Sequence, residues 1–83
     1  MNKKETVFLG EKKILSDYLS LKGYRETAQR ERILDVFMEN DRHMSAEELF
    51  LLVKKKDPSI GIATVFRALK IFVEAGIAEP VEF

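Results

Sequence analysis

The sequence has no cysteine, no tryptophan and a single histidine, His43, among its 83 residues. The absence of thiols excludes disulfides, thiolate zinc clusters, iron-sulfur centres and cysteine nucleophiles. One imidazole leaves little with which to build a Ser-His-Asp triad or a multi-histidine metal site, and no nucleophile is paired with a base. We therefore expect the chain not to be an enzyme.

Long apolar runs and an excess of either charge are also missing. The longest apolar run, Leu49 to Val53, is far shorter than the roughly 20 residues that span a bilayer, and the N-terminus has no signal-peptide core. We expect a cytoplasmic chain without membrane contact. Because 14 Lys and Arg residues balance 14 Asp and Glu residues, any nucleic-acid surface must come from local segregation of charge.

Helical patterning is what the sequence does contain. Four segments have apolar residues at helical spacing, and each is bounded by residues that start or end helices. They lie between Gly10 and Gly23, from Thr27 to Asn40, from Ser45 to Asp57, and between Gly61 and Gly76. Ser45 and Glu48 have the spacing of a capping box at the start of the third helix.

The segments follow the order of a winged helix-turn-helix, because about five residues join the third and fourth helices and a possible strand follows. Residues 77–83 carry β-branched and aromatic side chains, and Pro80 suits only an edge strand. The strand that would pair with this edge strand is either a segment near residues 42–44 or lies beyond residue 83. We expect a mainly α fold: an N-terminal arm at 1–10, then a winged-helix domain at 11–83 with an extra N-terminal helix and a short, incomplete β wing.

This layout alone leaves two functions open, DNA binding and a protein-interaction module without DNA binding. Four blocks of sequence, in order and spacing, resemble the N-terminal DNA-binding domain of the ferric uptake regulator family, over about residues 12 to 83. The blocks are GYRETAQR at 23–30, MSAEELF at 44–50, IGIATVFRAL at 60–69 and EAGI at 74–77. The resemblance favours DNA binding.

The resemblance implies a metal-responsive bacterial repressor that reads A·T-rich inverted repeats in double-stranded DNA. It implies a homodimer formed through a C-terminal dimerisation and metal-sensing domain that this chain lacks, so we expect the isolated domain to be a monomer. A divalent metal (iron, zinc or manganese) is implied for the full-length protein, and no cofactor for this chain. His43 stands where the family often has a metal ligand, although a histidine before a helix is also commonly a solvated or capping residue.

The resemblance also assigns DNA contacts. Arg25 occupies the family's basic position that reaches the minor groove, and Arg30 matches an arginine near the phosphates. Phe66 and Arg67 fall where the recognition helix of the family carries Tyr-Arg. Ala28 replaces the usual proline, and Phe66 lacks the tyrosine hydroxyl but keeps a ring that can contact a thymine methyl.

Helical spacing adds two further candidates. The apolar stripe of the fourth helix points Thr64, Phe66, Arg67 and Lys70 largely away from the core, although Phe66 packed on the second or third helix is an alternative. The segment from Lys22 to Arg32 contains four cationic residues and two carboxylates, so it has a local net positive charge. The predicted DNA-contacting surface thus combines the start of the second helix with the fourth helix.

Overall fold

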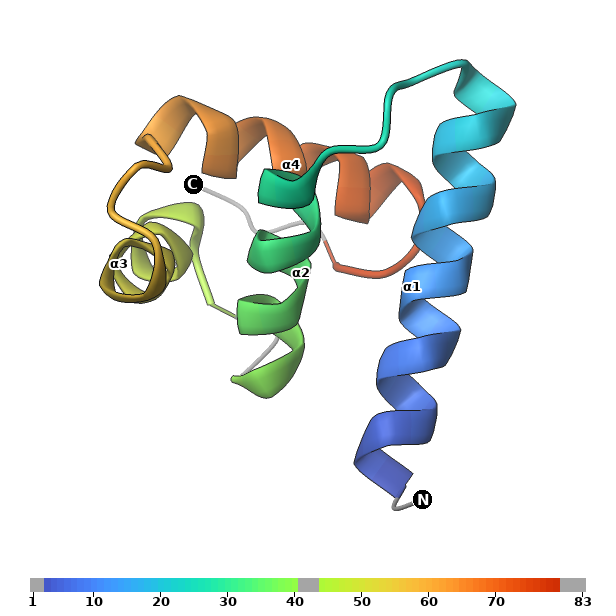
Figure 1. The fold of residues 1–83 in the computed structure, drawn as a ribbon, viewed down its shortest axis with the longest axis horizontal. Coiled ribbons are helices and arrows are strands. Elements are labelled where there is room, and N and C mark those ends of the chain that lie inside the picture. The colour runs from blue at the N-terminus through green and yellow to red at the C-terminus, as the bar shows by residue number, and fades with distance from the viewer. Residues whose placement is uncertain (1–2, 41–43, 80–83) are drawn as a thin grey trace.

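The computed structural model describes residues 3–40 and 44–79, which form four helices and no strand (Figure 1). The helices are α1 (Lys3–Lys22), α2 (Ala28–Glu39), α3 (Ala46–Lys56) and α4 (Ile62–Glu74). The last three helices pack on one another, and α1 lies to one side, against α2. The four predicted helices and the mainly α fold are confirmed.

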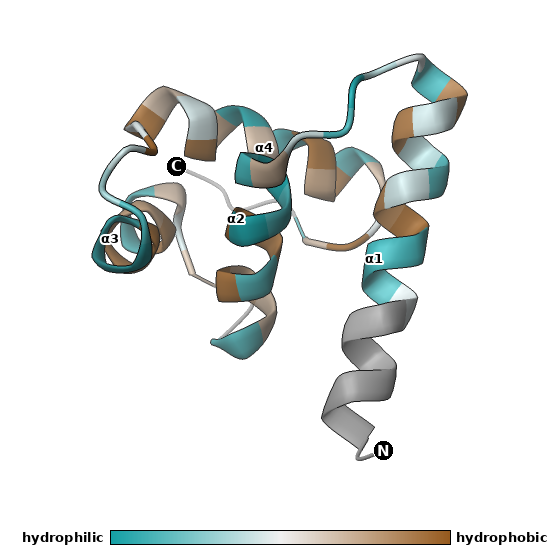
Figure 2. Cartoon of the chain, viewed as in Figure 1, coloured by the Kyte–Doolittle hydropathy of each residue, from teal (hydrophilic) through white to brown (hydrophobic). Residues whose placement is uncertain are grey.

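The core is formed by one buried apolar cluster to which all four helices contribute. Its centre is the ring pair of Phe37 on α2 and Phe72 on α4, both fully buried, with ring centroids 5.9 Å apart. Leu15 and Leu19 of α1 are also buried in this cluster. In Figure 2 the apolar residues of the last three helices are interleaved with hydrophilic ones, as expected of amphipathic helices.

Side-chain caps start two of the helices where the sequence predicts them. The Thr27 hydroxyl accepts a hydrogen bond from the Arg30 amide at 3.1 Å at the start of α2. Ser45 and Glu48 form both bonds of the capping box at the start of α3. Both caps satisfy amides that have no partner within their own helix.

Glycines end α1 and α4. Gly23 and Gly76 have φ angles of 72° and 81°, in the left-handed region that favours glycine. The amide of Ile77 donates to the carbonyl of Phe72 at 2.8 Å, and that of Gly76 to Val73 at 3.1 Å, which is the Schellman pattern of helix ending.

The same ending shows that the predicted strand is wrong for residues 77–79. The amide of Ala78 also donates to the Phe72 carbonyl, at 3.1 Å, and both Ile77 and Ala78 are buried. Amides engaged in capping α4 are not available for a strand ladder. The rest of the predicted wing, 80–83, and most of its proposed partner near 42–44 lie outside the described residues.

Helix α1 is longer at its N-terminus than the sequence predicts. Residues 3–10, expected as part of an arm, belong to α1, and Gly10 lies within the helix. A mid-helix glycine costs about 1 kcal/mol relative to alanine, and no proline occurs before it to break the helix. Lys12 forms an ion pair with Asp35 of α2 at 3.2 Å, which links α1 to α2.

Candidate nucleic-acid interface

The face of α4 that points away from the core is the first part of the candidate site. The opposite stripe of the helix is buried, which turns this face toward solvent. Arg67 and Lys70 are exposed on it, and Phe66 is 39% exposed, so Phe66 is not a core residue. Thr64 is half-buried at its edge, where the hydroxyl accepts a hydrogen bond from Arg67 Nη2 at 3.4 Å.

An open depression of 470 Å³ lies between the connection from α1 to α2 and the exposed face of α4. Arg25 and Arg30 line it from the side of α2, and Arg67 and Lys70 line it from α4. Figure 1 shows the connection passing across α4. The structure therefore brings four of the six predicted contact residues to one concave surface, while the other two, both on α4, lie outside it. We call this depression, with its four cations, the cationic depression.

Arg30 holds the rim of the cationic depression in place. Its Nη1 donates to the carbonyl of Arg25 at 2.5 Å, so one guanidinium braces the backbone that carries the other. Because the Thr27 hydroxyl caps α2 through the Arg30 amide, the connection is tied to the helix at two points. This arrangement reduces the conformational freedom of the Arg25 backbone before any ligand binds.

One carboxylate, Glu74, also lines the cationic depression. Its Oε2 accepts a hydrogen bond from the Tyr18 hydroxyl at 2.5 Å, which joins α1 to the end of α4. This hydrogen bond and the negative charge of Glu74 raise the pKa of Tyr18 to about 12. The phenol therefore stays protonated, and keeps donating to the carboxylate, to a higher pH than an ordinary tyrosine does.

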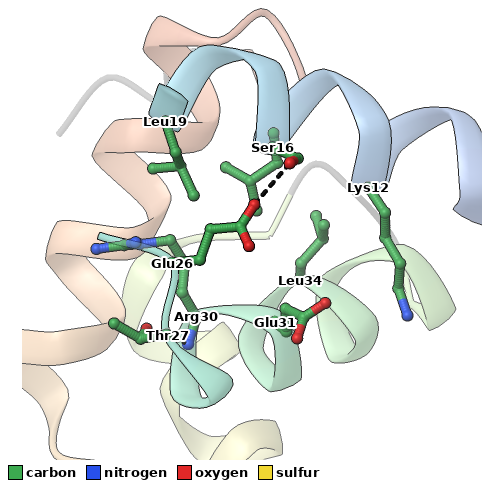
Figure 3. Close-up of a pocket in the computed structure, with 9 residues that line it drawn as sticks. Lys12, Ser16, Leu19, Glu26, Thr27, Arg30, Glu31 and Leu34 are labelled. Carbon is green, nitrogen blue, oxygen red and sulfur yellow. Dashed lines mark hydrogen bonds between the residues drawn. The ribbon is translucent and has the colours of Figure 1, made fainter. Parts of the chain in front are cut away.

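A second hollow, of 30 Å³, lies where α1 meets the start of α2 (Figure 3). Figure 3 shows Glu26 directed toward α1, where its Oε1 accepts a hydrogen bond from the Ser16 hydroxyl at 2.6 Å. Lys12 and Arg30 share this lining with Glu26 and Glu31, so cations and carboxylates balance. The hydrogen bond between Glu26 and Ser16 ties the connection to α1, and the lining of this hollow has no excess of positive charge.

Sequence reasoning did not include Tyr24 or Glu74 among the site residues, although both line the cationic depression. Both lie in blocks that carry the family resemblance, so their positions were a signal that could have been used. Tyr24 is 47% exposed, and its ring meets that of Tyr18 edge-on at 6.4 Å between centroids. Tyr18 and Glu74 are 56 residues apart in the sequence, and no local pattern predicts their contact.

A metal site is not assembled by the part of the chain that the structure describes. Within it, no group of three or more His, Cys, Asp or Glu side chains is placed to hold a metal ion. His43, the predicted candidate ligand, lies outside the described residues. The described residues therefore do not by themselves form a site that fits a metal ion. Nor is any helix of the described segments long and apolar enough to cross a membrane.

Comparisons with known proteins bear on this surface. Residues 21–83 match the model of the ferric uptake regulator family. The chain is 44% identical over 62 residues to the ferric uptake regulation protein of Bacillus subtilis (strain 168), covering 74% of this chain and 42% of that protein. It is 40% identical over 72 residues to that of Bordetella parapertussis, covering 83% and 52%. The solved structure of a manganese uptake regulator shares 35% identity with a TM-score of 0.68, covering 83% of this chain and 51% of that one.

The packed helices α3 and α4, joined by a short connection, form a helix-turn-helix unit, and cations gather beside α4, its second helix. The chain belongs to the ferric uptake regulator family, which consists of metal-responsive DNA-binding transcriptional regulators and not of enzymes. It corresponds to the N-terminal region of these proteins and spans about half the length of the curated relatives it matches.

Proposed function

We propose that this chain binds double-stranded DNA as the DNA-binding region of a cytoplasmic, metal-responsive repressor. The observation that carries the proposal is the cationic depression. The start of α2 and the connection before it contribute two of its cations, and α4 contributes the other two. DNA carries one negative charge per roughly 1.7 Å of duplex, so a concave surface lined by cations matches its backbone. The single carboxylate, Glu74, leaves the depression with an excess of positive charge.

The two sides of the depression are proposed to play different roles. The N-terminal part of α4 lies in the major groove, where Arg67 forms hydrogen bonds with a base edge. Lys70, one turn later, contacts a phosphate. Arg25 reaches the adjacent minor groove or backbone from the connection, and Arg30 lies near the phosphates.

The number of cations limits the affinity of one copy. If Arg25, Arg30 and Lys70 each neutralise one phosphate while Arg67 contacts a base edge, the logarithm of the binding constant falls with the logarithm of salt concentration with a slope of about −2.7. Such a slope weakens binding roughly 40-fold between about 50 and 200 mM salt. We infer that one copy binds weakly and that two copies of the longer protein, as a homodimer, bind an A·T-rich inverted repeat.

Fluorescence anisotropy with A·T-rich and G·C-rich duplexes tests the proposal. Arg67→Ala should cost about 1 to 3 kcal/mol on the preferred duplex and relax sequence preference, because it removes a base contact. Arg25→Ala should weaken all A·T-rich duplexes alike and reduce the salt slope by about 0.9. Arg32→Ala is the matched control, since Arg32 is exposed, lies outside the depression and pairs with Asp57 at 2.6 Å. Wild-type binding by both test variants would overturn the proposal and favour a protein-interaction module.

A further inference from the structure

Two large apolar side chains are exposed next to each other on α4. Ile62 is 44% exposed and Phe66 is 39% exposed, whereas the core-facing residues of the same helix are buried. Residues four apart on a helix lie on one face, with about 5 to 6 Å between their Cβ atoms. Ile62 and Phe66 therefore form one exposed apolar pair in the first turns of α4.

Exposed cations of α4 lie near this pair. Lys70 follows Phe66 by four residues, on the same side of the helix, and Arg67 is exposed on the adjoining side. A partner that covers the pair must therefore offer apolar groups within a negatively charged surface. The major groove of DNA meets this requirement, because the C5-methyl group of thymine is exposed there between the phosphate backbones.

The position of the pair along α4 agrees with such a partner. In helix-turn-helix proteins the N-terminal residues of the second helix contact base edges, and Ile62 is the first residue of α4. Base pairs are about 3.4 Å apart along each strand. A separation of about 5 to 6 Å between the two side chains thus spans one or two base steps.

We propose that Ile62 and Phe66 together read the methyl groups of two thymines one or two base steps apart. Ile62 is the additional specificity-determining residue in this assignment, which rests on the proposed DNA binding. Each side chain packs against one methyl group, and a contact with one methyl group corresponds to about fourfold in affinity. Preference for A·T pairs then arises partly from apolar contact and not only from hydrogen bonds.

Replacing single thymines by deoxyuridine tests the assignment, because it removes the methyl group and leaves the hydrogen-bonding edge unchanged. A preferred duplex is first selected from a random pool with the wild-type chain, and each thymine is then replaced in turn. We expect two positions, one or two steps apart, at which wild-type affinity falls about fourfold. Ile62→Ala should abolish the effect at one of them, and Phe66→Ala at the other.

Ile14→Ala is the matched control, because Ile14 is 43% exposed and belongs to α1 and not to α4. It should keep the wild-type response at every thymine. If Ile62→Ala also keeps the wild-type response, or no thymine is sensitive, the methyl-reading assignment is wrong while DNA binding stands. If no duplex is selected at all, the proposed function itself fails. Thermal melting of the variants checks that each remains folded.

Discussion

Phe66 and Phe72 are the same residue type on the same helix and differ in how deeply they are buried, so truncating each to alanine compares a surface role with a core role. Both phenylalanines lie on α4, but Phe72 is fully buried and Phe66 is 39% exposed. We therefore predict that Phe72→Ala unfolds or severely destabilises the protein, while Phe66→Ala lowers its stability moderately and reduces DNA binding. The comparison separates a core role from a surface role for Phe66.

The magnitudes follow from the two environments. A domain of 83 residues at 0.05 to 0.15 kcal/mol per residue has a free energy of unfolding of about 4 to 12 kcal/mol. Truncating a fully buried phenylalanine costs about 3 to 5 kcal/mol, and Phe72→Ala also removes the ring that packs on Phe37 at 5.9 Å. Phe66→Ala leaves no closed cavity and removes only partly buried surface, so it should cost about 1 to 2 kcal/mol.

Urea unfolding followed by far-ultraviolet circular dichroism measures both values, and thermal melting gives a second estimate. For a domain of this size, the cost of Phe66→Ala corresponds to a decrease of about 4 to 16 °C in Tm. Anisotropy with a preferred duplex then gives the affinity of the folded variant. A loss of stability for Phe66→Ala equal to that for Phe72→Ala would refute the reasoning, because Phe66 would then be a core residue.

Two further predictions concern pH. Glu74 raises the pKa of Tyr18 from 10.0 to about 12. The contribution of the Tyr18–Glu74 hydrogen bond to stability is therefore complete below pH 10 and is lost as the pH rises toward about 12. The urea midpoints of Tyr18→Phe should not show this alkaline loss. Hydrogen bonds from Ser59, and then Arg32, lower the pKa of Asp57 below its usual 3.8, so its contribution is present above that pH and is lost as the pH falls further. Melting curves between about pH 5 and pH 2 should show a steeper loss for wild type than for Asp57→Asn, and equal curves would remove this role of Asp57.

The helices could be predicted from the sequence because local chemistry sets their boundaries. Thr27 and Ser45 cap helices through contacts within three residues, and Gly23 and Gly76 supply positive φ angles at helix ends. The strand at 77–83 was inferred from side-chain types alone. The amides of residues 77 and 78 instead cap α4, a use that side-chain preference does not reveal.

The candidate site was predictable only in part. Helical spacing placed Arg67 and Lys70 on the exposed side of α4, since the buried stripe of that helix is regular. The resemblance to a family, together with the cations between Lys22 and Arg32, suggested Arg25 as their neighbour at one surface. Contacts between distant segments, such as that of Tyr18 with Glu74, depend on packing that no sequence period encodes.

A chain with no net charge can present a cationic surface because its ion pairs are unevenly distributed. Three ion pairs connect the helices away from the cationic depression: Lys12 with Asp35, Arg32 with Asp57, and Lys56 with Glu39. Within the described residues, none of the four cations of the depression takes part in an ion pair. Exposed pairs contribute only about 0 to 1 kcal/mol each to stability, but each of these three also neutralises a cation that lies outside the depression. A chain with no net charge thus has little general attraction to polyanions. The cations in its depression, unpaired among the described residues, still give a positive potential where α4 would meet DNA.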